Sequence, residues 1–228
     1  MKNSADNMAE IIPAILVESH AAFVERLRTV ENEVKTVQID IHDGILFPHT
    51  TYNDPRAVGA IMTPVSYELH LMVENPVAVA KEWCEHVPNV TRVIFHAEVD
   101  RQHGAIMENL RWLGKKVGIA INPETPVEEI HHDILDIDTL LIMTVHPGLS
   151  GQGMGDPTHG IAADDLLEKV RHIHRKYPEL ILETDGGNSQ ETIAAFRDAG
   201  ISRFAVGSAI FAAPDPKRAL YDLQSLVI

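Results

Sequence analysis

Polar side chains stand at every second position of one short apolar segment, Gln38-Ile39-Asp40-Ile41-His42-Asp43-Gly44. Successive side chains of a β-strand alternate between its two faces, so Gln38, Asp40 and His42 would share a face. An amide, a carboxylate and an imidazole are costly to bury unless a metal, a substrate or hydrogen-bonding partners compensate them. The solvent side of an edge strand shows the same alternation. The segment by itself therefore indicates either a functional site or an edge strand.

Further carboxylate, amide and imidazole side chains occur near the ends of other apolar segments: Glu68 and His70, His96 and Glu98, Asn122, His146 and Asp185. Carboxylates that converge with imidazoles suit a divalent metal with acid–base chemistry beside it. Any one of these histidines alone is more often a structural residue than a ligand. The prediction of a metal and proton-transfer site therefore depends on their convergence in the fold.

Glycine turns form a second group of candidates, at Asp185-Gly186-Gly187, Val206-Gly207-Ser208-Ala209 and Gly148–Gly151. Backbone N–H groups that are exposed at glycine turns and helix starts bind anions. A single glycine pair would be weak evidence, because glycine is common in ordinary turns. Their recurrence after consecutive strands favours a phosphate site.

The elements that must position these residues repeat along the chain. Apolar segments typical of buried strands begin near residues 11, 36, 66, 91, 116, 138, 179 and 203. Apolar residues at helical spacing and capping residues predict helices over residues 19–34, 53–61, 76–86, 102–113, 126–134, 163–173, 188–200 and 215–226. For the seventh helix, we predict that Asn188 and Glu191 form a capping box and that Gly200 ends it.

Eight strand–helix units with strands buried on both faces predict a (β/α)8 TIM barrel. We expect residues 1–10 to be a flexible leader and residues 11–228 to form a single barrel domain. In this fold the loops that follow the strands build the active face. The longest interval between strands contains the glycine-rich segment 146–155, which we predict to be a mobile lid or an anion cradle. An inert flexible insertion is the alternative.

Composition limits the classes of partner. The chain has 33 Asp and Glu against 19 Lys and Arg, for a net charge of −14, and no basic cluster interrupts this balance. We therefore expect no nucleic-acid binding. Cys84 is the single cysteine and cannot form an internal disulfide, and no run of 18 apolar residues appears. These features predict no membrane segment and a cytoplasmic location.

Ordered motifs over nearly the whole chain resemble those of the ribulose-phosphate 3-epimerase family. They are Ile12–Leu16, Ile39–Gly44 with Phe47-Pro48, Leu69–Pro76, Phe95–Glu98, Ala120–Pro126, Met143–Gly148, Thr184–Gly187 and Gly207–Phe211. The resemblance implies a ribulose-phosphate-binding TIM barrel that inverts C3 of a ketopentose phosphate and converts D-ribulose 5-phosphate to D-xylulose 5-phosphate. A sugar phosphate is thus the expected partner, and we expect a homo-oligomer.

The resemblance also implies roles for individual residues. Asp40 and Asp185 would be the acid–base pair, and one divalent metal ion of the Zn, Fe, Mn or Co class, bound by Asp40, His70 and Asp185, would stabilise the enediolate. The other implied substrate or phosphate contacts, besides His70, are Met72, Met143, Gly148, Leu149, Ser150, Gly151, Gly186, Gly187, Gly207 and Ser208.

Five positions depart from the family pattern. Ala14 replaces a serine, Gln38 a metal-binding histidine, His42 a methionine, His146 an asparagine and Ser150 a glycine-type residue. An amide oxygen is a weaker ligand than imidazole for zinc-like metals. Gln38 is therefore expected to be a weak or absent ligand, with His42 or His146 as candidate replacement. Alternatively, both histidines contact only substrate or solvent.

Three functions remain open from the sequence. The first is an active epimerase on ribulose 5-phosphate or another ketose phosphate, and the second a related phosphate-binding lyase or synthase. The third is a catalytically silent sugar-phosphate binder. We favour the first, because a silent barrel has no physical need to bury two carboxylates that face each other.

Overall fold

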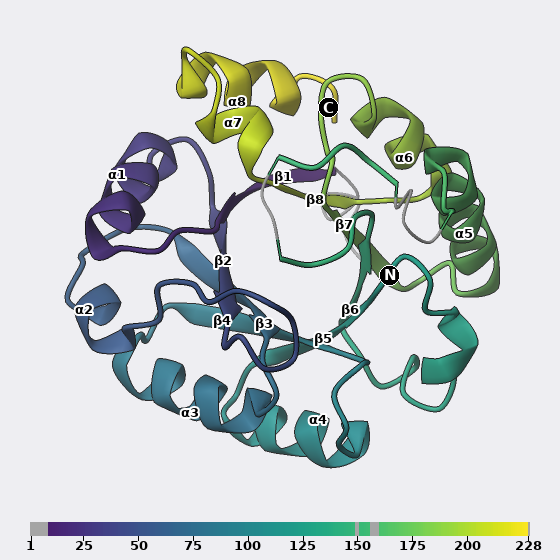
Figure 1. Ribbon diagram of the computed structural model, residues 1–228, viewed down its shortest axis with the longest axis horizontal. Helices are drawn as coiled ribbons and strands as arrows, with labels where there is room; N and C mark the ends of the chain where they lie inside the picture. The colour runs from purple at the N-terminus through teal and green to yellow at the C-terminus, as the bar shows by residue number, and fades with distance from the viewer. Residues whose placement is uncertain (1–8, 149–150, 156–159, 228) are drawn as a thin grey trace.

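The computed structural model describes residues 9–148, 151–155 and 160–227. Its strands form one closed parallel barrel in the order β1 to β8, surrounded by helices (Figure 1). The strands are β1 Glu10–Ile15, β2 Thr36–His42, β3 Ser66–Met72, β4 Val90–His96, β5 Lys116–Ile121, β6 Thr139–Met143, β7 Ile181–Asp185 and β8 Arg203–Val206. The predicted (β/α)8 TIM barrel is confirmed, and no edge strand remains among these eight.

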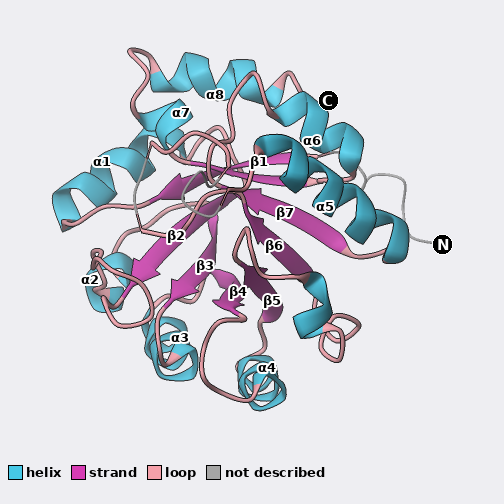
Figure 2. Cartoon of the chain, turned by 45° about the vertical axis from the view of Figure 1, so that its right-hand side comes forward, coloured by secondary structure: helices cyan, strands magenta, loops and turns pink. Residues whose placement is uncertain are grey.

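Helices and one 3₁₀ turn connect the strands on the outside of the barrel (Figure 2). They are α1 His20–Val30, α2 Pro55–Gly59, α3 Pro76–His86, α4 His103–Trp112, η1 Val127–Ile130, α5 Ala163–Lys176, α6 Ile193–Ala199, α7 Ser208–Phe211 and α8 Pro216–Gln224. No helix in the described ranges combines the length and the apolar character needed to cross a bilayer.

Side-chain caps start several of these helices where the sequence supplies a short polar residue. Ser19 Oγ accepts a hydrogen bond from Ala22 N at 3.3 Å, and Asp215 Oδ1 accepts one from Arg218 N at 3.1 Å. Asp54 and Asn75 cap α2 and α3 in the same way, each followed by proline at the first helical position. Each cap satisfies an N–H group that the helix itself leaves unpaired.

Alternation along the strands sorts side chains between two apolar regions. The larger region lies between the strands and the surrounding helices, and it contains most of the buried aliphatic and aromatic side chains. The smaller region consists of Ile94, Ala120, Leu141, Met143 and Val145. Because Ile94 and Leu141 alternate with residues of the larger region, this second cluster lies inside the barrel.

A buried charge network occupies the barrel interior toward the N-terminal ends of the strands. The Arg203 guanidinium donates to Glu10 at 2.7 Å, to Glu68 at 2.7 Å and to Glu183 at 2.9 Å. Arg92 donates to the same Glu68 oxygen at 2.7 Å. Both Glu68 and Glu183 are fully buried. The two guanidinium groups thus compensate carboxyl groups whose burial would otherwise be costly.

The network corrects the predicted position of Glu68. Glu68 was predicted to lie with His70 at the mouth of the barrel, but its carboxylate contacts Arg92 and Arg203. Residues two apart on a strand share a face but are about 6.6 Å apart along it. That displacement suffices to separate Glu68 from the mouth that His70 reaches.

Two predicted boundaries also change, and a third holds. The helix expected over 126–134 is only the 3₁₀ turn η1, and Lys169 Nζ donates to the carbonyl oxygens of Asn122, Pro123 and Thr125 just before it. The Asn188–Glu191 capping box is absent, because the Asn188 amide donates to carbonyl groups of Thr184 and Ala205 and α6 begins at Ile193. Gly200 does end α6, with φ of 119°.

The C-terminal boundary of the predicted leader, residues 1–10, also changes. Residues 1–8 lie outside the described residues, but Glu10 is the first residue of β1 and pairs with Arg203.

Candidate active site at the barrel mouth

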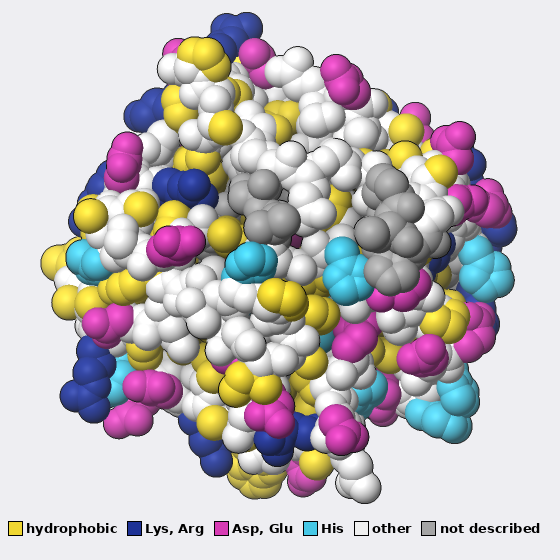
Figure 3. Space-filling model, in the orientation of Figure 1, with side chains coloured by type: hydrophobic (Ala, Val, Ile, Leu, Met, Phe, Trp, Pro, Cys, Tyr) yellow, Lys and Arg dark blue, Asp and Glu magenta, His cyan; other side chains and the backbone are white. Residues whose placement is uncertain are grey.

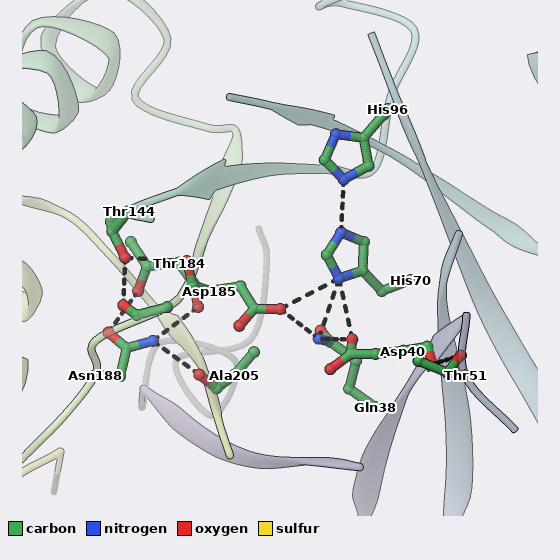
Figure 4. Close-up of polar contacts among 11 residues, drawn as sticks. Gln38, Asp40, Thr51, His70, His96, Thr144, Thr184, Asp185, Asn188 and Ala205 are labelled. Carbon is green, nitrogen blue, oxygen red and sulfur yellow. Dashed lines mark hydrogen bonds and ion pairs between the residues drawn. The ribbon is translucent and has the colours of Figure 1, made fainter. Parts of the chain in front are cut away.

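Four polar side chains from three strands meet inside the mouth of the barrel (Figure 4). Gln38 and Asp40 come from β2, His70 from β3 and Asp185 from β7. His70 Nδ1 lies 3.1 Å from Asp40 Oδ1 and 3.2 Å from Asp185 Oδ2. Gln38 Nε2 donates to Asp40 Oδ1 at 2.8 Å and to Asp185 Oδ2 at 2.7 Å. The two carboxylates therefore share the same two neighbours.

A chain of buried groups continues from His70 away from the carboxylates. His70 Nε2 lies 2.9 Å from His96 Nε2, and His96 Nδ1 lies 3.0 Å from Glu98 Oε2. The second Glu98 oxygen accepts from Asn122 N at 2.9 Å and from Thr125 Oγ1 at 2.6 Å. Glu98 thus fixes the orientation of His96, which in turn fixes that of His70.

The pKa values follow from burial and from these contacts. Burial alone would lower the pKa of His70, but hydrogen bonds to Asp185 and Asp40 outweigh it and raise this pKa to about 10. Burial raises the pKa of Asp40, and the Asp185 carboxylate adds to the rise. For His96, burial lowers the pKa. Burial would raise the pKa of Glu98, but its hydrogen bonds, above all from His96, hold that pKa well below its usual range.

These directions assign the protons along the chain. Glu98 stays ionised and accepts the Nδ1–H of a neutral His96, whose Nε2 then accepts the Nε2–H of His70. The remaining His70 nitrogen, Nδ1, faces both carboxylates.

Short loop contacts hold the two carboxylates in place. Thr51 Oγ1 donates to the Asp40 carbonyl at 2.9 Å and accepts from His42 N at 3.0 Å. Thr144 Oγ1 donates to the carbonyl oxygens of Asp185 and Gly186. The roles of Thr51 and Thr144 were not predicted from the sequence, in which their position just beyond a strand was the available signal.

A pocket that is partly open to solvent lies above these groups. Asp40, His70 and Asp185 line it, together with Met72 and Met143, and also Gly148, Gly151, Gly186, Gly187, Gly207 and Ser208. Leu149 and Ser150, predicted as further contacts, lie outside the described residues. The predicted proton-transfer residues and the predicted phosphate turns thus border one cavity.

The glycine turns present unused donors to this cavity. No backbone acceptor within the described ranges pairs with the N–H groups of Gly186, Gly187, Gly207 or Ser208. Gly187 has φ of 59°, and a Cβ there would lie 2.5 Å from Met154 N, so the turn requires glycine. Its conformation leaves these N–H groups available to an anion.

His42 and His146 also border the cavity but stand apart from the shared contacts of the carboxylates. His42 is 2% exposed, and neither of its ring nitrogens has a hydrogen-bond partner among the described groups. Burial lowers its pKa to about 4, with the charges of His70 and His96 adding to the effect. His146 Nε2 lies 3.1 Å from Glu124 Oε1 at the exposed rim.

Asp40, His70 and Asp185 form a donor set that fits a divalent cation. Each offers one ligand atom, and these atoms lie within 4.8 Å of one another. Carboxylate and imidazole donors suit zinc-like cations, and the contact between His70 and His96 resembles the hydrogen bond that orients metal-binding histidines. Within the described part of the chain, His42 and His146 do not belong to this set. Gln38 presents an N–H group, and not an oxygen, to it.

The outer surface around the mouth is mixed in character. On the face shown in Figure 3, Lys and Arg side chains are scattered among Asp and Glu and form no continuous basic patch.

Solved structures with similar backbones share this architecture. KGPDC from Streptococcus mutans superimposes with a TM-score of 0.70 at 13% identity, over 96% of this chain and 97% of that one. 3-Hexulose-6-phosphate synthase from Salmonella typhimurium gives 0.70 at 14% identity, over 96% and 98% of the two chains. At such identities the likeness concerns the fold alone.

Sequence comparison is more specific. The chain is 30% identical to a ribulose-phosphate 3-epimerase of Bacillus subtilis, over 95% of this chain and 99% of the relative. It is also 30% identical to one of Mycobacterium bovis, over 94% and 91% of the two chains. A family model described as the ribulose-phosphate 3 epimerase family matches residues 10–211, which include every strand of the barrel. The chain therefore belongs to the ribulose-phosphate 3-epimerase family.

Proposed function

We propose that the protein interconverts D-ribulose 5-phosphate and D-xylulose 5-phosphate by inverting C3, with Asp40 and Asp185 as the proton carriers. One observation carries the proposal: two carboxylates from β2 and β7 meet the same His70 nitrogen at 3.1 and 3.2 Å, beside a pocket lined by glycine turns. Inversion needs one group to remove a proton and another to return a proton on the opposite face. Family membership and this pair of acids support the same reaction.

The proton balance uses only these two acids. One carboxylate takes the C3 proton, negative charge moves onto the oxygen at C2, and the other carboxyl group, protonated beforehand, donates to the opposite face of C3. No net proton is taken up. After the reaction, the carboxyl group that was ionised carries the proton, and the one that was protonated is ionised. The raised pKa of Asp40 suits a group that must carry a proton near neutral pH.

His70 contributes by its position. Its Nδ1 lies between the two acids, and its orientation is held by His96 and Glu98. A divalent cation of the Zn, Fe, Mn or Co class would be held by Asp40, His70 and Asp185. When bound, it would supply electrostatic stabilisation of the negative charge on the enediolate oxygens.

We place the substrate phosphate at the turns of Gly186–Gly187 and Gly207–Ser208, because unused N–H groups border the pocket there. Gly148 and Gly151 line the same pocket and would be further contacts. Met72 and Met143, which are 3% exposed, would contact the sugar. We further propose a cytoplasmic homo-oligomer, and light scattering of the purified chain measures the oligomeric state directly.

Solvent deuterium exchange tests the two-acid assignment. NMR of ribulose 5-phosphate in D₂O should show deuterium entering C3, and Asp40→Asn and Asp185→Asn should each abolish conversion to xylulose 5-phosphate while the circular dichroism spectrum stays unchanged. Each substitution removes a proton carrier at nearly constant volume. Asp198→Asn, at a surface carboxylate, is the control and should exchange normally. Near wild-type turnover in either site variant would refute the assignment.

A further inference from the structure

The Gln38 side chain lies inside the donor set that fits a cation. It is fully buried, and its Nε2 atom lies 2.8 Å from Asp40 Oδ1, 2.7 Å from Asp185 Oδ2 and 3.4 Å from His70 Nδ1. These three side chains are the donor set that could hold the cation. Figure 4 shows the amide nitrogen between the two carboxylates, where dashed contacts from both acids converge. The nitrogen thus takes a place that a bound cation would share.

The chemistry of a primary amide accounts for this position. The –NH₂ group carries two donors, and each meets one carboxylate, so a single side chain compensates both acids. If the amide were turned by 180°, Oε1 would stand at the same 2.7–2.8 Å from two carboxylate oxygens with no hydrogen between them. That arrangement is repulsive unless a cation enters.

The other end of the amide leaves room for such a turn. Gln38 Oε1 is buried and has no hydrogen-bond partner within the described ranges. The side chain therefore gives up one acceptor contact in order to direct both donors at the carboxylates. A buried acceptor without a partner is costly, which indicates that the two charge-assisted contacts outweigh it.

We propose that the Gln38 amide takes the place of a divalent cation in assembling the site: it holds Asp40 and Asp185 together without metal, and a cation binds only when the amide turns its oxygen inward. Gln38 is thus a positioning residue. The proposal deepens the proposed function, since it concerns the same two acids.

Weak cation binding follows from this arrangement. A cation must displace two charge-assisted hydrogen bonds and then gains only an amide oxygen as its fourth ligand. With an imidazole at position 38, a cation would not have to break a pair of hydrogen bonds to the carboxylates. It would also gain a better ligand than an amide oxygen. The wild-type chain should therefore remain assembled when stripped of metal, and it should bind added metal less tightly than a histidine variant.

Cobalt titration of chelator-stripped protein tests the proposal. Four full-length proteins are compared: wild type, Gln38→His, Gln38→Met and a distant control, Gln102→His, which adds an imidazole at an exposed site. Calorimetry measures the affinity of each protein for Co²⁺, and the visible absorption of bound Co²⁺ reports its coordination. The melting temperature with and without Co²⁺ shows whether the site is assembled in the absence of metal. No arm uses a substrate, so a failure to epimerise ribulose 5-phosphate would refute the proposed function and leave this result standing.

We expect Gln38→His to bind Co²⁺ at least about tenfold tighter than wild type, as a better ligand in the donor set requires. Gln102→His should bind like wild type. Gln38→Met keeps the volume but loses both donors, so its stripped form should melt about 5 °C below stripped wild type, and Co²⁺ should recover most of that loss. If Gln38→Met does not fold, the affinities of wild type and Gln38→His still decide. Equal affinity in these two proteins, or a stripped wild type that melts as low as Gln38→Met, would overturn the proposal.

Discussion

Glu183 should make the stability of the protein fall as pH rises from about 5 to 8, and Glu183→Gln should remove that fall. In the buried network the two guanidinium groups of Arg92 and Arg203 are balanced by the carboxylates of Glu68 and Glu10. Glu183 is the third acid in a network of two cations, and it shares the Arg203 guanidinium with Glu68 and Glu10. Burial raises its pKa to about 8, and the Glu68 charge adds to the rise.

The sign follows from the proton count in the two states. In the unfolded chain Glu183 loses its proton near its ordinary pKa of 4.5, whereas in the folded protein it keeps the proton until about pH 8. Between these values unfolding releases a proton, so stability decreases as pH rises. At about 1.4 kcal/mol for each pKa unit, the whole interval amounts to on the order of 4–5 kcal/mol. The pKa of Glu68 is lowered, so its titration falls below this interval.

Urea unfolding of wild type and Glu183→Gln at half-unit steps from about pH 5 to 8.5 measures the effect. The variant keeps the volume of the protonated acid and cannot ionise, so the difference between the two free energies should be small at the acid end and should favour the variant by several kcal/mol at the alkaline end. Using this difference removes the contributions of histidines common to both proteins. Glu10→Gln removes a competing acid from Arg203, so the fall of stability with pH should be smaller in this variant than in wild type. Parallel curves for wild type and Glu183→Gln would refute the charge-balance reasoning.

Three further substitutions test individual contacts. Gly187→Ala places a Cβ 2.5 Å from Met154 N at a positive φ, so inorganic phosphate should inhibit the variant more weakly than wild type, and an unchanged inhibition constant would contradict the phosphate assignment. Lys169→Met removes three hydrogen bonds to the loop after β5 and should lower the free energy of unfolding by about 2 kcal/mol in urea; no loss would mean that solvent replaces them. Thr144→Val removes a donor to the Asp185 carbonyl, so kcat should fall while KM changes little, and the reverse pattern would show that Thr144 acts through substrate binding.

The barrel was predictable because every unit repeats the same apolar signal. Each strand is short and apolar and is followed by a helix or helical turn, and this local pattern survives in the structure from β1 to α8. The segment 126–134, expected as a helix, forms only a 3₁₀ turn, in which Glu129 N donates to Pro126 O and His131 N to Glu128 O. Asn188 failed as a helix cap because its amide contacts β7 and β8. The Asn188 error arises from a contact with Ala205, a residue that local spacing does not relate to it.

For the candidate site, the sequence predicts which residues lie on the same face of a strand. Alternation and family resemblance identified Asp40, His70 and Asp185, and the structure brings them together. Alternation does not fix height along the strand, so Glu68 was misplaced at the mouth. It also does not fix which atom of an amide points inward, and the contact of Gln38 Nε2 with both carboxylates could not be read from residue type.

Closure of the sheet has a consequence for how the chain reaches its native state. β1 pairs with β8, and the contact between Arg203 and Glu10 joins residues 193 positions apart. During synthesis the ribosome releases β1 long before β8 exists, so the growing sheet keeps two unpaired edges until the last strand emerges. Contacts of such long range form slowly, because the chain between them must first be ordered. The barrel therefore cannot close before β8 is available, and until then its two edge strands could pair with strands of another chain.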